Sequence, residues 1–300
     1  MFEISVIIPT YNRANYLEEL LNSILKMKDV SVEIIIINDN SSDNTDAIIR
    51  DKYLHYDNIR YLVNQHNEGC GQSRRKGLAV SRGEYIVFAD DDDYYTDYNF
   101  YRNGIKILQA SRNIACVAGN SKIYYHDKNY FVNSAQSISG LIVGSEFLNG
   151  FMTRFQKPKS TFSAIFKKTT LIQSGLLASP MVNDASIYMR ALLYGDIYIL
   201  DNTIGVYRVH NHNISNNLTS RFIIDNLDEK LRIYQRAKRL NIYLDSYWLS
   251  RQFDLTASYY FNNNKYTLTD ILKIVKWGMS NNALCLKHLI RILPSLIIKK

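Results

Sequence analysis

The segment EYIVFADDDDYY, residues 84–95, decides the fold of this chain. Tyr85–Ala89 are aromatic, β-branched or apolar, which predicts a strand buried on both faces. Four consecutive aspartates follow this strand directly: Asp90, Asp91, Asp92 and Asp93. Carboxylates packed so closely at the end of a buried strand repel one another. The segment therefore predicts a bound cation at this point or, as the alternative, an acidic loop solvated by water.

The residues before this segment alternate between strand and helix patterns. Continuous apolar runs predict strands at 4–9, 32–39 and 59–64, and apolar residues at helical spacing predict helices at 16–27, 41–54 and 71–81. Asn15 is the predicted cap of the first helix. Strand and helix in strict alternation are typical of a parallel α/β sheet with right-handed crossovers.

After residue 100 the strict alternation of strand and helix patterns ends. We expect strands at 114–127, 160–168 and 196–210, and helices at 169–177 and 184–195. The asparagine-rich patches 211–217 and 262–264 are predicted loops. From about Asp225 the apolar spacing is helical almost to the end of the chain.

The charge of the chain is uneven. The net charge is +8, and residues 226–300 hold 13 Lys and Arg against 5 Asp and Glu, which accounts for the whole excess. A basic segment of this kind suits an anionic membrane face, a phosphorylated partner or nucleic acid. Because no nucleic-acid-binding module is recognisable, we expect no nucleic-acid partner.

The cysteines and the hydropathy bear on the compartment. Cys70, Cys116 and Cys285 are odd in number and widely spaced, which predicts unpaired thiols in a reducing compartment. Met1 runs directly into a predicted strand, and no window of about 18 apolar residues occurs. The sequence therefore predicts a cytoplasmic protein without a secretory signal, placed at the inner face of the membrane by its basic segment.

Polar clusters follow the first four predicted strands. They read PTYNR (9–13), NDNSSDNT (38–45), NEGCGQSRRKG (67–77) and DDDD (90–93). In parallel sheets, ligands bind beyond the carboxyl ends of the strands. We therefore interpret Asp90, Asp91 and Asp92 as a site for Mg²⁺ or Mn²⁺ that carries a diphosphate. No GxxxxGK[ST] motif occurs, which argues against a P-loop nucleotide hydrolase.

Six motifs between residues 4 and about 215 give the chain a family resemblance. They are SVIIPTYNR, NDNSSDNT, NEGCGQSRRKG, GEYIVFADDDD, NDASIYMR and YRVHNHNIS, in this order. The chain resembles the family 2 glycosyltransferases with the GT-A fold, which move a sugar from a nucleotide diphosphate to an acceptor. The resemblance implies a mixed, mostly parallel sheet flanked by helices, followed by a helical C-terminal appendage.

The resemblance also implies a division of the chain. The GT-A catalytic domain would span residues 1–222, with a nucleotide-binding half at 1–100 and an acceptor half at 101–222. A helical C-terminal region would occupy residues 223–300.

The nucleotide-binding residues follow from the resemblance, position by position. Pro9 and Tyr11 would line the base pocket, and Arg13 belongs to the same motif. Asp39 would accept a hydrogen bond from the uracil imide, because Asn38 stands where the family commonly has a first aspartate. Arg74 would meet the nucleotide phosphates.

The metal-binding residues are carried over in the same way. Asp90 and Asp92 match the DxD pair, and Asp92 would hold Mn²⁺ or Mg²⁺, while Asp91 or Asp90 would reach the ribose or the sugar. His210 matches the histidine that completes the metal shell or contacts the diphosphate. Asp93, Arg208 and Ser215 occupy flanking positions.

Asp184 matches the position of the general base. An acceptor hydroxyl needs a base within hydrogen-bond reach to take its proton, and attack from the face opposite the nucleotide would invert the anomeric centre. The alternative role for Asp184 is that of a helix cap, for which Asn183 competes.

The resemblance implies a metal-dependent, inverting glycosyltransferase in bacterial cell-surface polysaccharide synthesis. Its donor would be a UDP-sugar and its acceptor a glycan or a lipid-linked glycan. The alternative is a catalytically silent nucleotide-sugar-binding protein of the same fold. The segment RFQKPKSTFS, residues 154–163, would border the acceptor, and its two lysines hint at an acidic or phosphorylated one.

Residues 268–300 allow two interpretations. They form either helices that pack on the catalytic domain or on a second subunit of a homo-oligomer, or a membrane-surface helix. In the membrane-surface interpretation the apolar side chains would enter lipid and the basic ones would meet headgroups. The apolar set is Leu284, Leu289, Ile292, Leu293, Leu296 and Ile297, and the basic set is Lys287, Arg291, Lys299 and Lys300.

Overall fold

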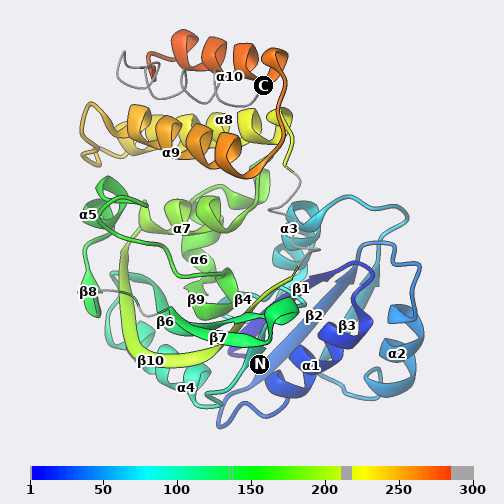
Figure 1. Ribbon diagram of the computed structural model, residues 1–300. Helices are drawn as coiled ribbons and strands as arrows, with labels where there is room; N and C mark the ends of the chain where they lie inside the picture. Colours follow the sequence, from blue (N-terminus) through cyan, green and yellow to red (C-terminus); the bar gives the residue numbers. More distant parts are fainter. Residues whose placement is uncertain (1, 135, 137, 211–217, 285–300) are drawn as a thin grey trace. The chain divides into compact units, whose positions relative to one another are not determined.

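The computed structural model describes residues 2–134, 136, 138–210 and 218–284 (Figure 1). The chain divides into two compact units, Met1–His210 and Asn211–Lys300. This division lies before the boundary at residue 222 that the sequence suggests. Each unit is described here by itself.

The first unit is built on one mixed sheet with the strand order β3-β2-β1-β4-β9-β6-β10-β5, in which β7 pairs with β6 and β8 with β10. The strands are β1 Ile4–Thr10, β2 Val32–Asn38, β3 Ile59–Val63, β4 Tyr85–Phe88, β5 Tyr94–Tyr95, β6 Ile114–Tyr125, β7 Tyr130–Ser134, β8 Gly140–Ile142, β9 Ala164–Lys167 and β10 Asp196–Val209. β1 to β4 pair in parallel, whereas β9 runs antiparallel to both β4 and β6. The predicted mixed, mostly parallel sheet is confirmed.

Helices cover this sheet. They are α1 Ala14–Ile24, α2 Thr45–Lys52, α3 Cys70–Val80, α4 Phe100–Ala110, α5 Gly144–Asn149, α6 Lys168–Gln173 and α7 Asp184–Leu192. Short 3-10 helices lie at His126–Lys128, Thr161–Ser163 and Leu176–Ala178. The alternation of strand and helix through α3 follows the pattern that the apolar periodicity predicts.

The core explains why the early strands are mostly apolar. Every residue of β1 and β2 is buried. α3 approaches β1 so closely that a Cβ atom at Gly77 would lie 2.3 Å from Cγ2 of Ile7. A glycine is therefore needed at this point of the helix, and the close approach holds α3 firmly on the sheet.

The register of the strands brings their polar loops to one edge. Thr10 pairs with Asn38, and Asn38 pairs with Val63, so β1, β2 and β3 end level with one another. Figure 1 shows these three strands side by side. The loops that follow them therefore begin next to one another, as the sequence predicts.

Several predicted element boundaries are wrong, for identifiable reasons. α1 begins at Ala14, and Asn15 is not its cap; instead Oδ2 of Asp43, from the loop after β2, accepts the N–H of Ala14 at 3.2 Å. The predicted strand 160–168 is shorter, because Thr161–Ser163 form a 3-10 turn before β9. Asn263 continues α9 instead of lying in a loop.

The second unit contains three described helices, α8 Ser220–Arg239, α9 Trp248–Asn263 and α10 Leu268–Ser280 (Figure 1). Trp248 is fully buried and stacks on Tyr234 at 5.9 Å. A buried lysine, Lys230, donates to Oγ1 of Thr256 at 2.6 Å and to the carbonyl oxygen of Gln252 at 3.4 Å. The expected helical C-terminal region is confirmed within residues 218–284.

The described residues test the membrane and thiol predictions only in part. Of the helices that the structure describes, none has both the length and the apolar character needed to cross a bilayer. Cys70 and Cys116 are free thiols, as predicted, whereas Cys285 lies outside the described residues. The predicted membrane-surface residues from Lys287 to Lys300 also lie outside them.

Candidate active site at the carboxyl ends of the strands

The loops after β1 and β2 are tied together by Asn12. This residue has a left-handed backbone with φ of 55°, which asparagine tolerates better than most residues. Its Oδ1 accepts the backbone N–H of Ser42 at 2.7 Å, and its own N–H donates to Oγ of Ser41 at 2.9 Å. These bonds fix the turn from which the next residue, Arg13, projects.

Arg13 bridges two of the four consecutive aspartates. Its Nη1 donates to Oδ1 of Asp91 at 2.9 Å and to Oδ2 of Asp92 at 2.8 Å. Both aspartates are only 4% exposed. Nε2 of His210 lies 3.0 Å from the same oxygen of Asp92, and the imidazole stacks on Tyr16 at 5.3 Å. Arg13, Asp91, Asp92 and His210 therefore form one contact group.

Arg74 joins the first aspartate to the predicted base. From α3, Nη2 of Arg74 donates to Oδ1 of Asp90 at 2.5 Å and lies 3.3 Å from Oδ1 of Asp184. Oγ of Ser160 donates to Oδ2 of Asp90 at 3.0 Å. Nζ of Lys157 lies 3.5 Å from Oδ2 of Asp184. This second contact group adjoins the first through the consecutive residues 90–92.

The start of α7 shows which residue caps the helix. Oδ1 of Asn183 accepts the N–H of Ser186 at 2.9 Å, and Oγ of Ser186 accepts the N–H of Asn183 at 3.0 Å. These two bonds form a capping box, with Asn183 as the cap. The capping position is thereby filled, and the carboxylate of Asp184 is left to contact Arg74 and Lys157.

Asp90, Asp91 and Asp93 have pKa values shifted toward the neutral form. Burial raises the pKa of Asp90, although Arg74 opposes the shift. Burial raises the pKa of Asp91 to about 7, against the pull of Arg13. The pKa of Asp93 lies well above its ordinary value, first because of burial and then because of the charges of Asp92 and Asp90. The cluster thus holds less negative charge than its composition suggests.

Asp184 is shifted the other way. Burial alone would raise its pKa, but Lys157 and Arg74 outweigh that effect and hold the pKa below its ordinary value. The Asp184 carboxylate is therefore ionised near neutral pH, and it binds a proton weakly while both cations stay in contact with it.

Asp39, the predicted uracil-binding residue, fixes the loop before α3. Its Oδ1 accepts from Nδ2 of Asn64 at 2.7 Å and from the N–H of Glu68 at 2.9 Å, and its Oδ2 accepts from the N–H of Gly69 at 2.7 Å. Two carboxylate oxygens offer about four lone-pair sites, so one acceptor site remains for a base. Asp39 thus has a structural role that its motif does not reveal.

The other predicted residues lie around these groups. Pro9 is buried in β1, whereas Tyr11 is 46% exposed and available to a ligand. Oδ1 of Asp93 accepts the backbone N–H of Arg208 at 3.1 Å. The side chain of Arg208 turns to Glu19 at 2.5 Å and lies over the ring of Tyr16 at 4.5 Å. Ser215 falls outside the described residues.

Three residues that support the site are absent from the sequence prediction. Ser160 reaches Asp90 from 70 residues away, Asn64 holds Asp39, and Tyr16 supports the imidazole of His210. Asn64 directly follows β3 and begins the polar run there, so its position at the strand end is a signal that sequence reasoning could have used. Ser160 and Tyr16 have no such signal, because only the folding of distant segments brings them to the site.

Asp92 and His210, the two predicted metal ligands, lie next to each other. Two adjacent ligands of an octahedral ion with bonds of about 2.1 Å lie about 3.0 Å apart. Oδ2 of Asp92 and Nε2 of His210 are 3.0 Å apart, which is also a hydrogen-bond distance, and Nη1 of Arg13 donates to the same oxygen of Asp92. In the part of the chain that the structure describes, no group of three or more His, Cys, Asp or Glu residues is arranged to hold a metal ion. The remaining ligands would then come from diphosphate oxygens and water.

The charge argument from the sequence needs a correction. Repulsion among the four aspartates predicts a metal ion, but the protein supplies its own compensation through Arg13 and Arg74. The fit of a metal therefore depends on the positions of Asp92 and His210, and the charge of the cluster alone does not require it.

Comparisons with known proteins place the chain in a family. The model for "Glycosyl transferase family 2" matches residues 5–193. The "GalNAc(5)-diNAcBac-PP-undecaprenol beta-1,3-glucosyltransferase" of Campylobacter jejuni is 29% identical over 214 residues, which are 70% of this chain and 65% of that protein. "Glycosyltransferase GlyG" of Streptococcus pneumoniae is 40% identical over 91 residues, which are 30% of each protein. The chain thus spans less than two thirds of the length of these relatives.

A solved structure agrees on the fold. S. aureus TarS 1–349, crystallised in complex with UDP-GlcNAc, matches with a TM-score of 0.71 at 18% identity, covering 95% of this chain and 82% of the 1–349 chain. At this identity the likeness bears on the fold alone. Since the family model covers more than half of the chain, the chain belongs to glycosyl transferase family 2 and has the GT-A fold that its motifs predict.

Proposed function

We propose that the chain transfers a sugar from a UDP-sugar to a hydroxyl group of a glycan or a lipid-linked glycan, with inversion of the anomeric centre. The observation that carries this proposal is the position of Arg74, which contacts both Asp90 and Asp184. A cation suited to phosphate and a carboxylate suited to proton transfer are thereby neighbours at the sheet edge where ligands bind.

Arg74 has a donor to spare for a phosphate group. Its side chain is 4% exposed, and its Nε has no hydrogen-bond partner among the described residues. A buried donor without a partner costs free energy, which a phosphate oxygen would recover. This feature supports the assignment of Arg74 to the diphosphate of the donor.

The proposed step moves one proton and one sugar. Asp184 accepts the proton of the acceptor hydroxyl, and the hydroxyl oxygen forms a bond to the anomeric carbon. The bond from that carbon to the diphosphate oxygen breaks, and its electron pair leaves with UDP. The proton remains on the carboxyl group of Asp184. Attack from the face opposite the leaving group inverts the configuration, while Arg74 compensates the charge that develops on UDP.

A divalent ion belongs to the proposal. Enzymes of this family generally use divalent metals. Asp92 and His210 would hold Mn²⁺ or Mg²⁺, which would supply positive charge for the departing diphosphate. Arg13 donates to Oδ2 of Asp92 and would hold this carboxylate in place.

The relatives support the substrate classes. The relative from C. jejuni is named for a lipid-linked substrate, GalNAc(5)-diNAcBac-PP-undecaprenol. TarS was crystallised with UDP-GlcNAc. By analogy we assign this chain a UDP-sugar donor and an acceptor from bacterial cell-surface polysaccharide synthesis.

A donor screen tests the proposal. Purified protein is incubated with UDP-, GDP- and dTDP-sugars, with Mn²⁺, with Mg²⁺ or with EDTA, and the release of nucleoside diphosphate is measured. We expect hydrolysis of at least one UDP-sugar that is faster with a metal ion than with EDTA. Binding of UDP without hydrolysis of any donor would favour the silent binding protein instead, and metal-independent hydrolysis would remove the metal from the proposal.

A further inference from the structure

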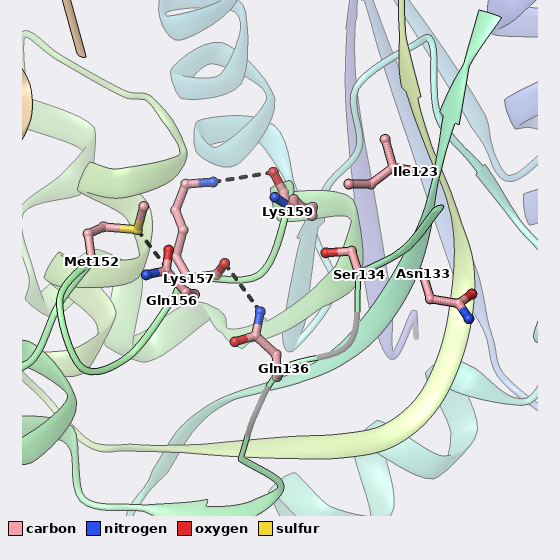
Figure 2. A pocket seen from close by; sticks show the side chains of 8 residues that line it. All are labelled: Ile123, Asn133, Ser134, Gln136, Met152, Gln156, Lys157 and Lys159. Carbon is pink, nitrogen blue, oxygen red and sulfur yellow. Dashed lines mark hydrogen bonds between the residues drawn. The ribbon is translucent and has the colours of Figure 1, made fainter. Parts of the chain in front are cut away.

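A pocket of about 340 Å³ lies beside the candidate base. Ile123 of β6 and Asn133 and Ser134 of β7 line one side of it. Met152, Gln156 and Lys157, from the segment between α5 and β9, line the other side (Figure 2). Its volume falls within the range of small-ligand sites, which is about 300–1,000 Å³.

Lys157 connects this pocket to Asp184. Its side chain lines the pocket, and its Nζ lies 3.5 Å from Oδ2 of Asp184. The carbonyl oxygens of Pro158 and Lys159 accept from the same Nζ at 3.2 Å and 3.3 Å and fix its position. A molecule that fills the pocket and contacts Lys157 would therefore present its neighbouring groups to Asp184.

The pocket has a positive lining. Two lysines, Lys157 and Lys159, line it, and among the described residues that line it there is no aspartate or glutamate. Lys159 is exposed, and its ammonium group has no hydrogen-bond or ion-pair partner within the described part of the chain. Amide and hydroxyl groups on Asn133, Ser134 and Gln156 suit the hydroxyls of a sugar. The two ammonium groups add a preference for negative charge.

We propose that this pocket is the acceptor subsite, and that it takes a sugar carrying an anionic group, a carboxylate or a phosphate, which Lys157 and Lys159 bind. The proposal rests on the proposed function, because Asp184 must act on the acceptor hydroxyl for the position of the pocket to matter. It adds the chemical class of the acceptor, which the family does not determine.

The arrangement also couples acceptor binding to the base. An anion that draws Lys157 away from Asp184 removes one of the two cations that keep the pKa of Asp184 low. The proton affinity of the Asp184 carboxylate would then rise when an acceptor is in place. A neutral sugar would leave Lys157 on Asp184 and would gain no such help.

Three matched probes test the pocket. The probes are methyl β-D-glucuronide, methyl β-D-glucoside 6-phosphate and neutral methyl β-D-glucoside, and their affinities for the full chain are measured by ligand-observed NMR at low salt. We expect at least one anionic probe to bind about tenfold more tightly than the neutral probe, and the preference to weaken as salt is added. The tighter of the two anionic probes identifies a carboxylate or a phosphate as the natural group.

Variants assign the preference to the pocket. Lys157→Gln and Lys159→Gln should each reduce the preference for the anionic probe several-fold and leave the affinity for the neutral probe unchanged. Lys106→Gln, which changes an exposed lysine on α4, serves as the control and should keep the preference. Equal binding of all three probes, failure of both anionic probes to bind, or a preference that survives the double substitution at Lys157 and Lys159 would overturn the proposal.

The outcome is separable from that of the proposed function. Probe binding needs neither donor nor turnover, whereas the donor screen needs no acceptor. If the chain hydrolyses a donor but binds all three probes equally, only the acceptor assignment is refuted. A clear anion preference in a chain that hydrolyses no nucleotide sugar would instead count against the proposed transfer.

Discussion

Asp91 and Asp184 lie in two neighbourhoods of one site and differ in the cations around them. Asp91 is almost fully buried and shares the guanidinium of Arg13 with Asp92. Asp184 is 25% exposed at its side chain and has two cations, Arg74 and Lys157. The pKa of Asp91 rises to about 7, while that of Asp184 falls below its ordinary value. Burial and the number of cations around each carboxylate together determine whether its pKa rises or falls.

The difference between these two neighbourhoods indicates that they have separate roles. The neighbourhood of Asp91 and Asp92 holds two buried carboxylates around one guanidinium, and in the proposed function it would take a metal ion. In the neighbourhood of Asp184, one ionised carboxylate contacts two cations, which in the proposed function the substrates would draw away. Donor phosphate would compete for Arg74 and an anionic acceptor for Lys157, so Asp184 would become a stronger base only when both substrates are bound.

Removing the carboxylate of Asp184 is expected to have the largest effect on activity. Asp184→Asn keeps the shape of the side chain but takes away the proton acceptor. We expect sugar transfer to fall by about 10² to 10⁴-fold, the usual contribution of a general base, while UDP binding stays intact. Transfer rates and calorimetric UDP affinities measure the two effects.

Asn183→Ala is the matched control for that variant. It removes the helix cap next to Asp184 and should cost about 1 kcal/mol of the free energy of unfolding, with a far smaller effect on transfer. If Asp184→Asn retains full activity, or if Asn183→Ala loses as much activity as Asp184→Asn, the base assignment fails.

Removing Arg13 tests the first neighbourhood. Arg13→Gln leaves Asp91 and Asp92 side by side without their shared guanidinium. We expect a loss of about 3 kcal/mol in the free energy of unfolding, measured by urea denaturation, because a buried charge loses its partner. Added Mn²⁺ should restore stability more in this variant than in the wild type, since it would supply the missing positive charge.

An exposed ion pair provides the control for Arg13. Arg102 pairs with Asp29 at 2.5 Å, but both side chains are substantially exposed. Arg102→Gln should therefore cost about 1 kcal/mol or less. Equal losses for the two arginines would show that the compensation of Asp91 and Asp92 contributes little to the stability of the fold.

Lys230 offers a third case, a buried cation that donates to neutral oxygens. Burial lowers the pKa of Lys230 to about 8. Between pH 8 and about 10.5 the folded chain has released this proton while the unfolded chain still holds it, so this group stabilises the fold increasingly as pH rises. The slope is at most about 1.4 kcal/mol per pH unit, and below pH 8 the contribution stays at its minimum.

The isosteric variant Lys230→Met isolates this contribution. Urea denaturation of both proteins from pH 7 to pH 10.5 gives the difference in their free energies of unfolding. We expect the free energy of unfolding of the variant to exceed that of the wild type by the largest amount near pH 7. This difference should shrink as the pH approaches 10.5. A difference that does not change with pH would mean that Lys230 keeps its proton in the folded chain.

The sequence by itself determined the order of β1 to β4 and α1 to α3, and the sheet edge at which their polar loops gather. Apolar runs and helical spacing are local signals, and they located β1 to β4 and α1 to α3 to within a few residues. Because the carboxyl ends of parallel strands meet at one edge, the polar runs after these strands predicted where Arg13, Asp39, Arg74 and Asp90 would gather.

Only the tertiary structure decided which charges meet. That Arg13 bridges Asp91 and Asp92, that Arg74 joins Asp90 to Asp184, and that Ser160 reaches Asp90 depends on how segments far apart in sequence fold back on one another. Local periodicity holds no information about such contacts. The same holds for the pocket beside Asp184, whose two sides come from β6 and β7 and from a distant irregular segment.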